Sequence, residues 1–290
     1  MDAMATVSAT QFMKCQARPR ILSSPRSPSA NAAVALYFLL AGISCGTALG
    51  QEGGDFAGPT DLVATMPDPY NIHLQWKNHG AADGGNMVQF QSYPEGAGLP
   101  AEHREKFLIL GFFDSKVDTF RHEKLGAETV LSYRIHPYFG NGTEPVSITT
   151  GSAAAAKNEP DEAEGPLEDP EKNPKVGSTL VSLRAPQTFA GAAPTELTLS
   201  LSSATHVVLR WRDRAVDADG YLVEISRLPD RDYQVCALLP PHSTSLRKNA
   251  LPPETKIYFR VRAFFYGPPS NVVTRTTGPE PLQAVETKKN

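Results

Sequence analysis

The chain has 290 residues, of which 40% are hydrophobic, and a formal net charge of −3. A chain of this length has room for about two domains of ordinary size. So small a net charge gives no electrostatic reason to expect binding to nucleic acid or to a membrane surface. The three cysteines, Cys15, Cys45 and Cys236, exclude a framework of disulfides.

The first part of the chain, residues 1–50, has the features of a secretory signal. Residues 1–26 are basic and rich in Ser and Pro, an apolar run follows at 32–43, and small residues precede Gln51. This order predicts a signal peptide that is removed before Gln51, so that the mature protein is secreted. The alternative is an uncleaved membrane anchor, because the apolar stretch counted to Leu49 reaches the shortest length that spans a bilayer. Membrane attachment is expected only in that case.

The rest of the chain contains one unit twice. Residues 125–137 read Leu-Gly-Ala-Glu-Thr-Val-Leu-Ser-Tyr-Arg-Ile-His-Pro, and residues 251–263 read Leu-Pro-Pro-Glu-Thr-Lys-Ile-Tyr-Phe-Arg-Val-Arg-Ala. In each copy a turn precedes alternating apolar and polar residues, which is the period of a half-buried strand. Earlier segments, such as those ending at Trp76 and Trp211, match at a constant offset. The first unit has a longer middle, residues 92–117, which predicts a surface loop.

Short alternating segments separated by Pro, Gly and Asp predict an antiparallel β-sandwich for each unit. The first unit spans residues 59–151 and the second spans residues 194–278. Trp76 and Trp211 close the second strand of each unit, and we expect both to be buried core anchors. The predicted fold class is therefore all-β, with two sandwiches.

Four motifs carry a family resemblance: Pro-x-x-Leu at the start, a Trp closing the second strand, Gly-Tyr-x-Val on the third, and Leu-x-Pro-x-Thr-x-x-x-Phe-Arg-Val-x-Ala on the sixth. Together they resemble a fibronectin type III domain, and the second unit is the better match. The resemblance extends to the last strands, 146–151 and 272–278. It departs at Leu131 and Ile257, where the family has a tyrosine, so the corner hydrogen bond of that tyrosine is expected to be absent while its apolar packing is kept.

The segment that joins the units, residues 152–193, differs from both. Its centre, residues 157–175, holds seven acids, three lysines and four prolines. Such a composition buries too little apolar surface to offset the entropy of ordering, and it predicts a disordered acidic tether. The more apolar residues 179–189 are expected to add a strand or to pack on the second unit. Residues 279–290 form a polar tail.

Motifs for catalysis or metal binding are weak. Residues 42–46 fit the nucleophile elbow of serine hydrolases, but they lie in the leader and not between a strand and a helix. His122-Glu123 lacks the second histidine of a zinc protease helix. Asp217 and Asp219 are ordinary turn residues, since no glutamate follows at the spacing of a calcium loop. We therefore expect no enzyme, no metal and no cofactor.

Two positions are candidates for modification. Asn141 begins an N-glycosylation sequon, Asn-Gly-Thr, which we expect in an exposed loop between strands. Cys236 is the only cysteine beyond the leader. We expect its thiol to stay outside any disulfide and to be buried as a small hydrophobe, and the alternative is a bond to another chain.

The sixth strand of the second unit provides the best candidate for a binding surface. Its period of two sends one row of residues outward, next to outward residues of the third strand: Tyr258, Arg260, Arg262 and Phe264, with Leu222, Glu224 and Ser226 beside them. Aromatic and arginine side chains are typical of binding hot spots, although Arg260 can instead form an ordinary pair with Glu224.

The sequence thus predicts a non-catalytic extracellular protein for binding or adhesion, built from two tethered sandwiches. Its partner is expected to be a protein or a ligand of the matrix or cell surface, and not a nucleic acid. One alternative is an inert spacer or matrix component. Another is an accessory module of an extracellular hydrolase complex.

Overall fold

The computed structural model describes residues 56–79, 84–98, 106–159, 162–168, 180–185 and 187–279. The predicted signal or anchor, the elbow motif inside it and all of the tail after Pro279 lie outside these residues. The first half of the chain contributes strands β1 (Thr60–Asp68), β2 (Asn71–Lys77), β3 (Gly85–Pro94), β4 (Leu108–Asp114), β5 (Thr119–His122), β6 (Thr129–Phe139) and β7 (Val146–Thr149).

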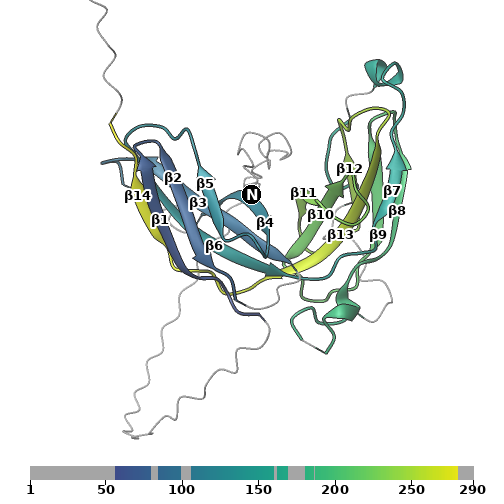
Figure 1. The fold of residues 1–290 in the computed structure, drawn as a ribbon. Helices are drawn as coiled ribbons and strands as arrows, with labels where there is room; N and C mark the ends of the chain where they lie inside the picture. The colour runs from purple at the N-terminus through teal and green to yellow at the C-terminus, as the bar shows by residue number, and fades with distance from the viewer. Residues whose placement is uncertain are drawn as a thin grey trace, which may run out of the picture.

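The second half contributes strands β8 (Thr195–Leu201), β9 (Val207–Arg212), β10 (Gly220–Ser226), β11 (Gln234–Leu239), β12 (Ser245–Lys248), β13 (Lys256–Tyr266) and β14 (Val273–Thr276). Two short 3-10 helices, η2 (Ala155–Asn158) and η3 (Ala190–Ala192), lie between the halves. The predicted all-β fold with two antiparallel sandwiches is confirmed. Figure 1 shows the sandwiches as the two arms of a U, with the long strands β6 and β13 running into its base.

Each sandwich packs a three-stranded sheet against part of a larger one. The small sheets have the orders β1-β2-β5 and β12-β9-β8. The large sheet has eight strands, with the path β11-β10-β13-β6-β3-β4, to which β7 adds beside β13 and β14 beside β6. Alternate residues of the strands face inward, as the period of two requires, and they form one core in each sandwich.

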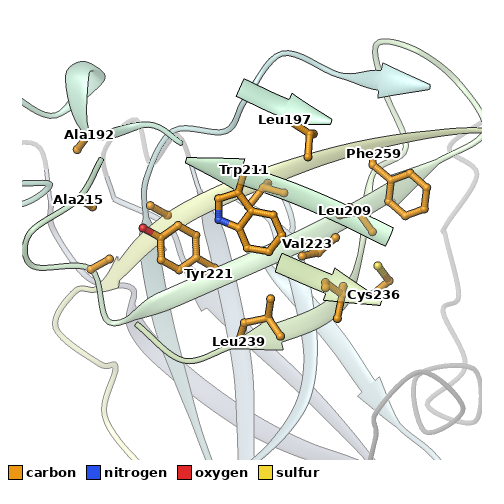
Figure 2. Close-up of a cluster of buried hydrophobic side chains, with 14 of the residues drawn as sticks. Ala192, Leu197, Leu209, Trp211, Ala215, Tyr221, Val223, Cys236, Leu239 and Phe259 are labelled. Carbon is orange, nitrogen blue, oxygen red and sulfur yellow. The ribbon is translucent and has the colours of Figure 1, made fainter. Parts of the chain in front are cut away.

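The two tryptophans lie in these cores. Trp76 is 4% exposed and Trp211 is 5% exposed. Figure 2 shows Trp211 in the second core, surrounded by Leu209, Tyr221 and Val223. Leu131 and Ile257, where the resemblance led us to expect apolar packing without a tyrosine hydroxyl, are each 2% exposed and occupy the core.

The last strand of each repeat crosses into the other sandwich. β7 follows β6 in the chain but pairs antiparallel with β13, and β14 follows β13 but pairs antiparallel with β6. The sequence assigned the last strands, 146–151 and 272–278, to their own units, and this assignment is wrong. Each sandwich is completed by the strand of the other repeat.

The exchange occurs because neither strand turns back where it ends. After Phe139 the chain stays extended and runs beside β13, where Thr143 N–H donates to the Val261 carbonyl over 2.8 Å. After Tyr266 the chain runs beside β6 in the same way, and Ser270 N–H donates to the Ile135 carbonyl over 2.9 Å. Pro268 and Pro269 favour extended backbone on this second crossing.

The ends of β6 and β13 also pair with each other. Phe139 lies opposite Phe265, and Tyr138 lies opposite Tyr266. This short pairing joins the large sheets of the two sandwiches into one sheet of eight strands. The rings of Phe139 and Phe265 have centroids 5.5 Å apart, and Phe56 packs edge-on against both of them at 5.0 Å. The two modules are therefore joined by strand pairing as well as by the segment between them.

Parts of the predicted disordered tether are ordered on the second sandwich. Leu183 is fully buried in the second core, and Val181 forms a parallel bridge with Ala215. The expectation that residues 179–189 pack on the second unit is confirmed. One of the acidic residues that the structure describes also has a partner there, since Glu159 accepts a hydrogen bond from Ser203 Oγ over 2.7 Å. Composition alone failed here because the acids find polar partners on the sandwich surface and need no core of their own.

The turn aspartates hold the same segment in place. Asp217 accepts hydrogen bonds from Ser182 Oγ and from Leu183 N–H, both over 2.6 Å. Asp219 forms an ion pair with Arg184 over 2.7 Å. These carboxylates therefore act as structural acceptors for residues 182–184.

We expect Trp211→Ala to lower the free energy of unfolding by about 3–5 kcal/mol, because it leaves a cavity in the second core. The control is Leu201→Ala, since Leu201 is 44% exposed and its truncation should cost no more than about 0.5 kcal/mol. Urea unfolding followed by tryptophan fluorescence and circular dichroism measures both. Equal losses in the two variants would contradict the placement of Trp211.

A second prediction concerns the crossing after β6. Gly140 has φ of +155°, and a Cβ atom there would lie 1.9 Å from the Ala263 carbonyl oxygen. We expect Gly140→Ala to cost about 2–3 kcal/mol, because the clash and the strained backbone both act on the junction. Gly142→Ala is the matched control, since the nearest atom to its Cβ would be at an ordinary 3.6 Å. Chemical denaturation that finds the two variants equally stable would refute the close crossing.

Candidate interaction surface

One face of the eight-stranded sheet points away from both cores, and we call it the shared face. On β6 this face carries the residues that alternate with core residues such as Tyr133 and Ile135. On β13 it carries the residues that alternate with core residues such as Phe259 and Val261. Because β6 and β13 are paired at their ends, the two rows continue into each other. The row consists of Arg134, His136 and Tyr138 from β6 and of Tyr258, Arg260, Arg262, Phe264 and Tyr266 from β13.

The centre of the shared face is closed by an apolar cluster. Met87, Tyr138, Leu222 and Phe264 are buried together, with Tyr266 among the partly buried residues around them. The rings of Phe264 and Tyr266 have centroids 5.0 Å apart. The expectation that Phe264 and Leu222 point into solvent is therefore wrong, because residues of the two arms cover each other at the base of the U (Figure 1).

A charged group lies beside this cluster on the second arm. Glu224 is 4% exposed and accepts hydrogen bonds from Arg260 Nε over 2.5 Å and from Arg260 Nη2 over 3.2 Å. Arg262 is 6% exposed; its Nε lies 3.6 Å from the Glu224 carboxylate, and its Nη1 donates to the Gly140 carbonyl. The expected exposure of Glu224 and Arg262 is wrong. The alternative pairing of Arg260 with Glu224 is what the structure contains.

The accessible part of the predicted row lies nearer the start of β13. The guanidinium of Arg260 stacks on the ring of Tyr233, with 4.1 Å between its Cζ and the ring centroid. Lys256 Nζ lies 5.2 Å from the centroid of Tyr258. Tyr233, Tyr258 and Arg260 are half-buried and Lys256 is exposed. These four residues form an arginine–aromatic cluster on the second arm, with cation–π contacts that fix the side chains.

The first arm carries an equivalent arginine–aromatic cluster. Arg134 stacks on Phe107 with 4.1 Å between Cζ and ring centroid, and its Nε donates to Gln89 Oε1 over 2.7 Å. Gln89 lies opposite Arg134 in the sheet just as Glu224 lies opposite Arg260. The repeat thus places two arginines, each with an acceptor and an aromatic ring, on the shared face.

Sequence reasoning missed Arg134, Phe107 and Tyr233. The repeated Tyr-Arg-Ile and Phe-Arg-Val motifs were a signal for the arginine pair. Phe107 and Tyr233 gave no such signal, because they precede the edge strands β4 and β11, where the two repeats differ in length.

Burial holds two histidines of the first arm in the neutral form. His136 stacks edge-on against Tyr266 at 4.7 Å, and burial, with the nearby Arg134 charge, lowers its pKa to about 4. His122 lies in β5 of the small sheet, with its Nδ1 2.8 Å from the Tyr133 hydroxyl, and burial lowers its pKa to about 4. Burial, together with the Asp219 charge, raises the pKa of Tyr266 to about 12, so this phenol also stays neutral.

The two candidate modification sites are both less accessible than a loop tip. Asn141 is half-buried at the crossing into the second sandwich, where its Nδ2 lies 3.5 Å from the Phe189 carbonyl. The expectation of an exposed loop is wrong there, because the chain does not turn back. Cys236 is 4% exposed in the second core, and the described residues contain no disulfide that involves it.

Within the described ranges, no group of three or more His, Cys, Asp or Glu side chains is arranged to hold a metal ion. In that same part of the chain, no helix has the length and apolar character needed to cross a membrane.

No family model matches the chain, and no curated protein matches it. Solved structures do. A two-domain fibronectin type III segment of chicken tenascin has 15% identity and a TM-score of 0.23, with 76% of this chain and 100% of that chain covered. The FN1–FN3 domains of chicken contactin (CNTN1) have 13% identity and a TM-score of 0.23, with 76% and 98% covered.

A single domain is also similar, the sixth fibronectin type III domain of human fibronectin type III domain containing protein 3. It has 26% identity and a TM-score of 0.22, with 30% of this chain and 86% of that chain covered. Each half of this chain is an antiparallel β-sandwich.

The two neutral histidines make stability depend on pH. Their folded pKa of about 4 lies below the ordinary value of 6.5, so the unfolded chain binds more protons between these values. The contribution to stability is therefore complete above about pH 6.5 and is lost as the pH falls toward 4. We expect the urea midpoint to fall over this window, and to fall less steeply in His122→Gln and in His136→Gln.

The control for this measurement is His79→Gln, because His79 is exposed. This variant should reproduce the pH dependence of the unmodified chain. If the histidine variants at 122 and 136 also reproduce it, the two rings are not held neutral by the fold.

Proposed function

We propose that this chain is a non-catalytic extracellular protein for binding or adhesion, which presents the shared face of two joined fibronectin type III-like sandwiches to a protein or cell-surface ligand. The observation that carries the proposal is the pair of equivalent arginine–aromatic clusters, Arg134 with Phe107 and Arg260 with Tyr233, on one continuous sheet. The extracellular location rests on the predicted signal in residues 1–50.

Composition and rigidity both support this use of the shared face. Arginine and tyrosine are enriched among residues that dominate binding energy. The stacked geometry holds Arg134 and Arg260 in place before a ligand arrives, so less side-chain entropy is lost on binding. The pairing of β6 with β13 fixes the two arms, and a ligand that reaches both clusters does not have to order a tether between them.

A second candidate function is a spacer or matrix component. The strand exchange favours it, because β7 and β14 join the arms whether or not a ligand is present. A spacer needs the junction and has no use for the arginine–aromatic clusters. Nothing in the described residues favours the third alternative, an accessory module of an extracellular hydrolase.

The decisive experiment removes both arginines. We expect the double variant Arg134→Ala with Arg260→Ala to bind a panel of arrayed extracellular proteins and cell-surface ligands at least about ten-fold more weakly than the unmodified chain, because each arginine is a hot-spot residue. The matched control removes two exposed arginines from the small sheets, Arg121→Ala with Arg212→Ala, and should bind normally.

Circular dichroism melts of both double variants establish that they are folded. A ligand bound equally by the two variants would contradict the use of the shared face. The spacer would be favoured by two results together. The unmodified chain would bind nothing in the panel, and Gly140→Ala would lose stability.

A further inference from the structure

Part of the joining segment lies along the edge of the second small sheet. Residues 162–168, here called the acidic strap, run beside β12, which is the outer strand of the order β12-β9-β8. Gly165 and Arg247 exchange two backbone hydrogen bonds, of 3.2 Å and 2.8 Å, in an antiparallel bridge. Leu167 N–H donates to Ser245 Oγ over 3.3 Å. The acidic strap therefore binds as an extended strand binds to a sheet edge.

Every charged side chain of the acidic strap pairs with a cation of the sandwich. Glu162 pairs with Arg247 at 3.1 Å, Glu164 with Lys248 at 2.8 Å, and Glu168 with Arg210 at 2.6 Å. All three acids come from the strap, and all three cations come from β9 and β12.

The pair at Lys248 is the most enclosed of the three. The Lys248 side chain is 9% exposed, and its Nζ donates to both oxygens of Glu164, at 2.8 Å and 2.9 Å. The same carboxylate accepts from Asn249 N–H over 3.1 Å. A charge that is this enclosed is held there only with a partner of opposite sign.

A segment that served only to cover the edge would need no such match of charges. Proteins block free sheet edges with a loop, a proline or a single charge. The edge strand of the first small sheet, β5, has a neighbour only on its β2 side among the described residues. The three cations Arg210, Arg247 and Lys248 thus add selectivity for acidic side chains to a backbone edge that accepts any extended chain.

We propose that the edge of β12, with Arg210, Arg247 and Lys248, is a binding site for an extended acidic segment of a partner protein, and that the acidic strap occupies this site until the partner displaces it. The strap is part of the same chain, so it competes at an effective concentration on the order of millimolar. Displacement therefore requires a partner with more contacts than the strap makes. This site lies on the small sheet and does not depend on the shared face.

The test uses a fluorescent peptide with the sequence of residues 159–168, Glu-Pro-Asp-Glu-Ala-Glu-Gly-Pro-Leu-Glu, and fluorescence anisotropy with the full chain. We expect the triple variant Glu162→Gln, Glu164→Gln and Glu168→Gln, which weakens the strap, to bind this peptide at least ten-fold more tightly than the unmodified chain. Adding Arg247→Gln and Lys248→Gln should remove the gain. A peptide with glutamine in place of its glutamates should not bind.

A second strap variant keeps the test independent of the charge changes. Gly165→Pro removes the N–H that donates to Arg247 and cannot adopt the φ of +147° found at Gly165. It should also bind the peptide more tightly than the unmodified chain, and the gain should shrink as salt is raised. Melting curves exclude unfolding of either variant.

Two outcomes would overturn the proposal. If neither strap variant binds the peptide more tightly than the unmodified chain, the strap is only an edge cover. If the strap variants bind heparin and not the peptide, the row of cations serves a sulfated polysaccharide. The double variant Arg134→Ala with Arg260→Ala should bind the peptide as the unmodified chain does, so failure of the shared face and failure of this site are separable.

Discussion

The pairing of β6 with β13 at Phe139 and Phe265 is the interaction on which the rest of the structure depends. It allows β7 and β14 to continue straight into the opposite sandwich, where each occupies the edge that the last strand of the other repeat leaves open. Removing either half would therefore expose a sheet edge and part of a core in the other. Two repeats that look independent in sequence are expected to unfold as one cooperative unit, and the orientation of the two arms is fixed by backbone hydrogen bonds.

The cores were predictable because burial follows the period of each strand. Trp76, Trp211, Leu131 and Ile257 are buried for reasons that are local to their strands. The exchange was not predictable in this way, because β7 and β14 are short strands that pair through their backbones, and either sandwich offers them a similar edge. Which edge is used depends on whether the chain turns back after Phe139, and alternation along one strand carries no information about that.

The same limit applies to the shared face. Alternation showed that Phe264 and Arg260 lie on the same side of β13, but a side is exposed only if nothing covers it, and the first arm covers Phe264. Composition misjudged the acidic segment for a related reason, since Glu164 is held by Lys248 and needs no apolar core. In each case the missing information was a contact with a residue that is distant in sequence.

The most direct test of the strand exchange is a designed disulfide. Ser132 Oγ and Thr274 Oγ1 are 2.8 Å apart on paired positions of β6 and β14, which is suitable geometry for a bond between two cysteines. The double variant Ser132→Cys with Thr274→Cys should form that bond within one chain, identified by mass spectrometry of peptides from the monomer. A second double variant, Ser132→Cys with Ser147→Cys, tests the opposite arrangement, in which each repeat keeps its own last strand. If this second variant forms the disulfide within one chain and the first does not, that result contradicts the exchange.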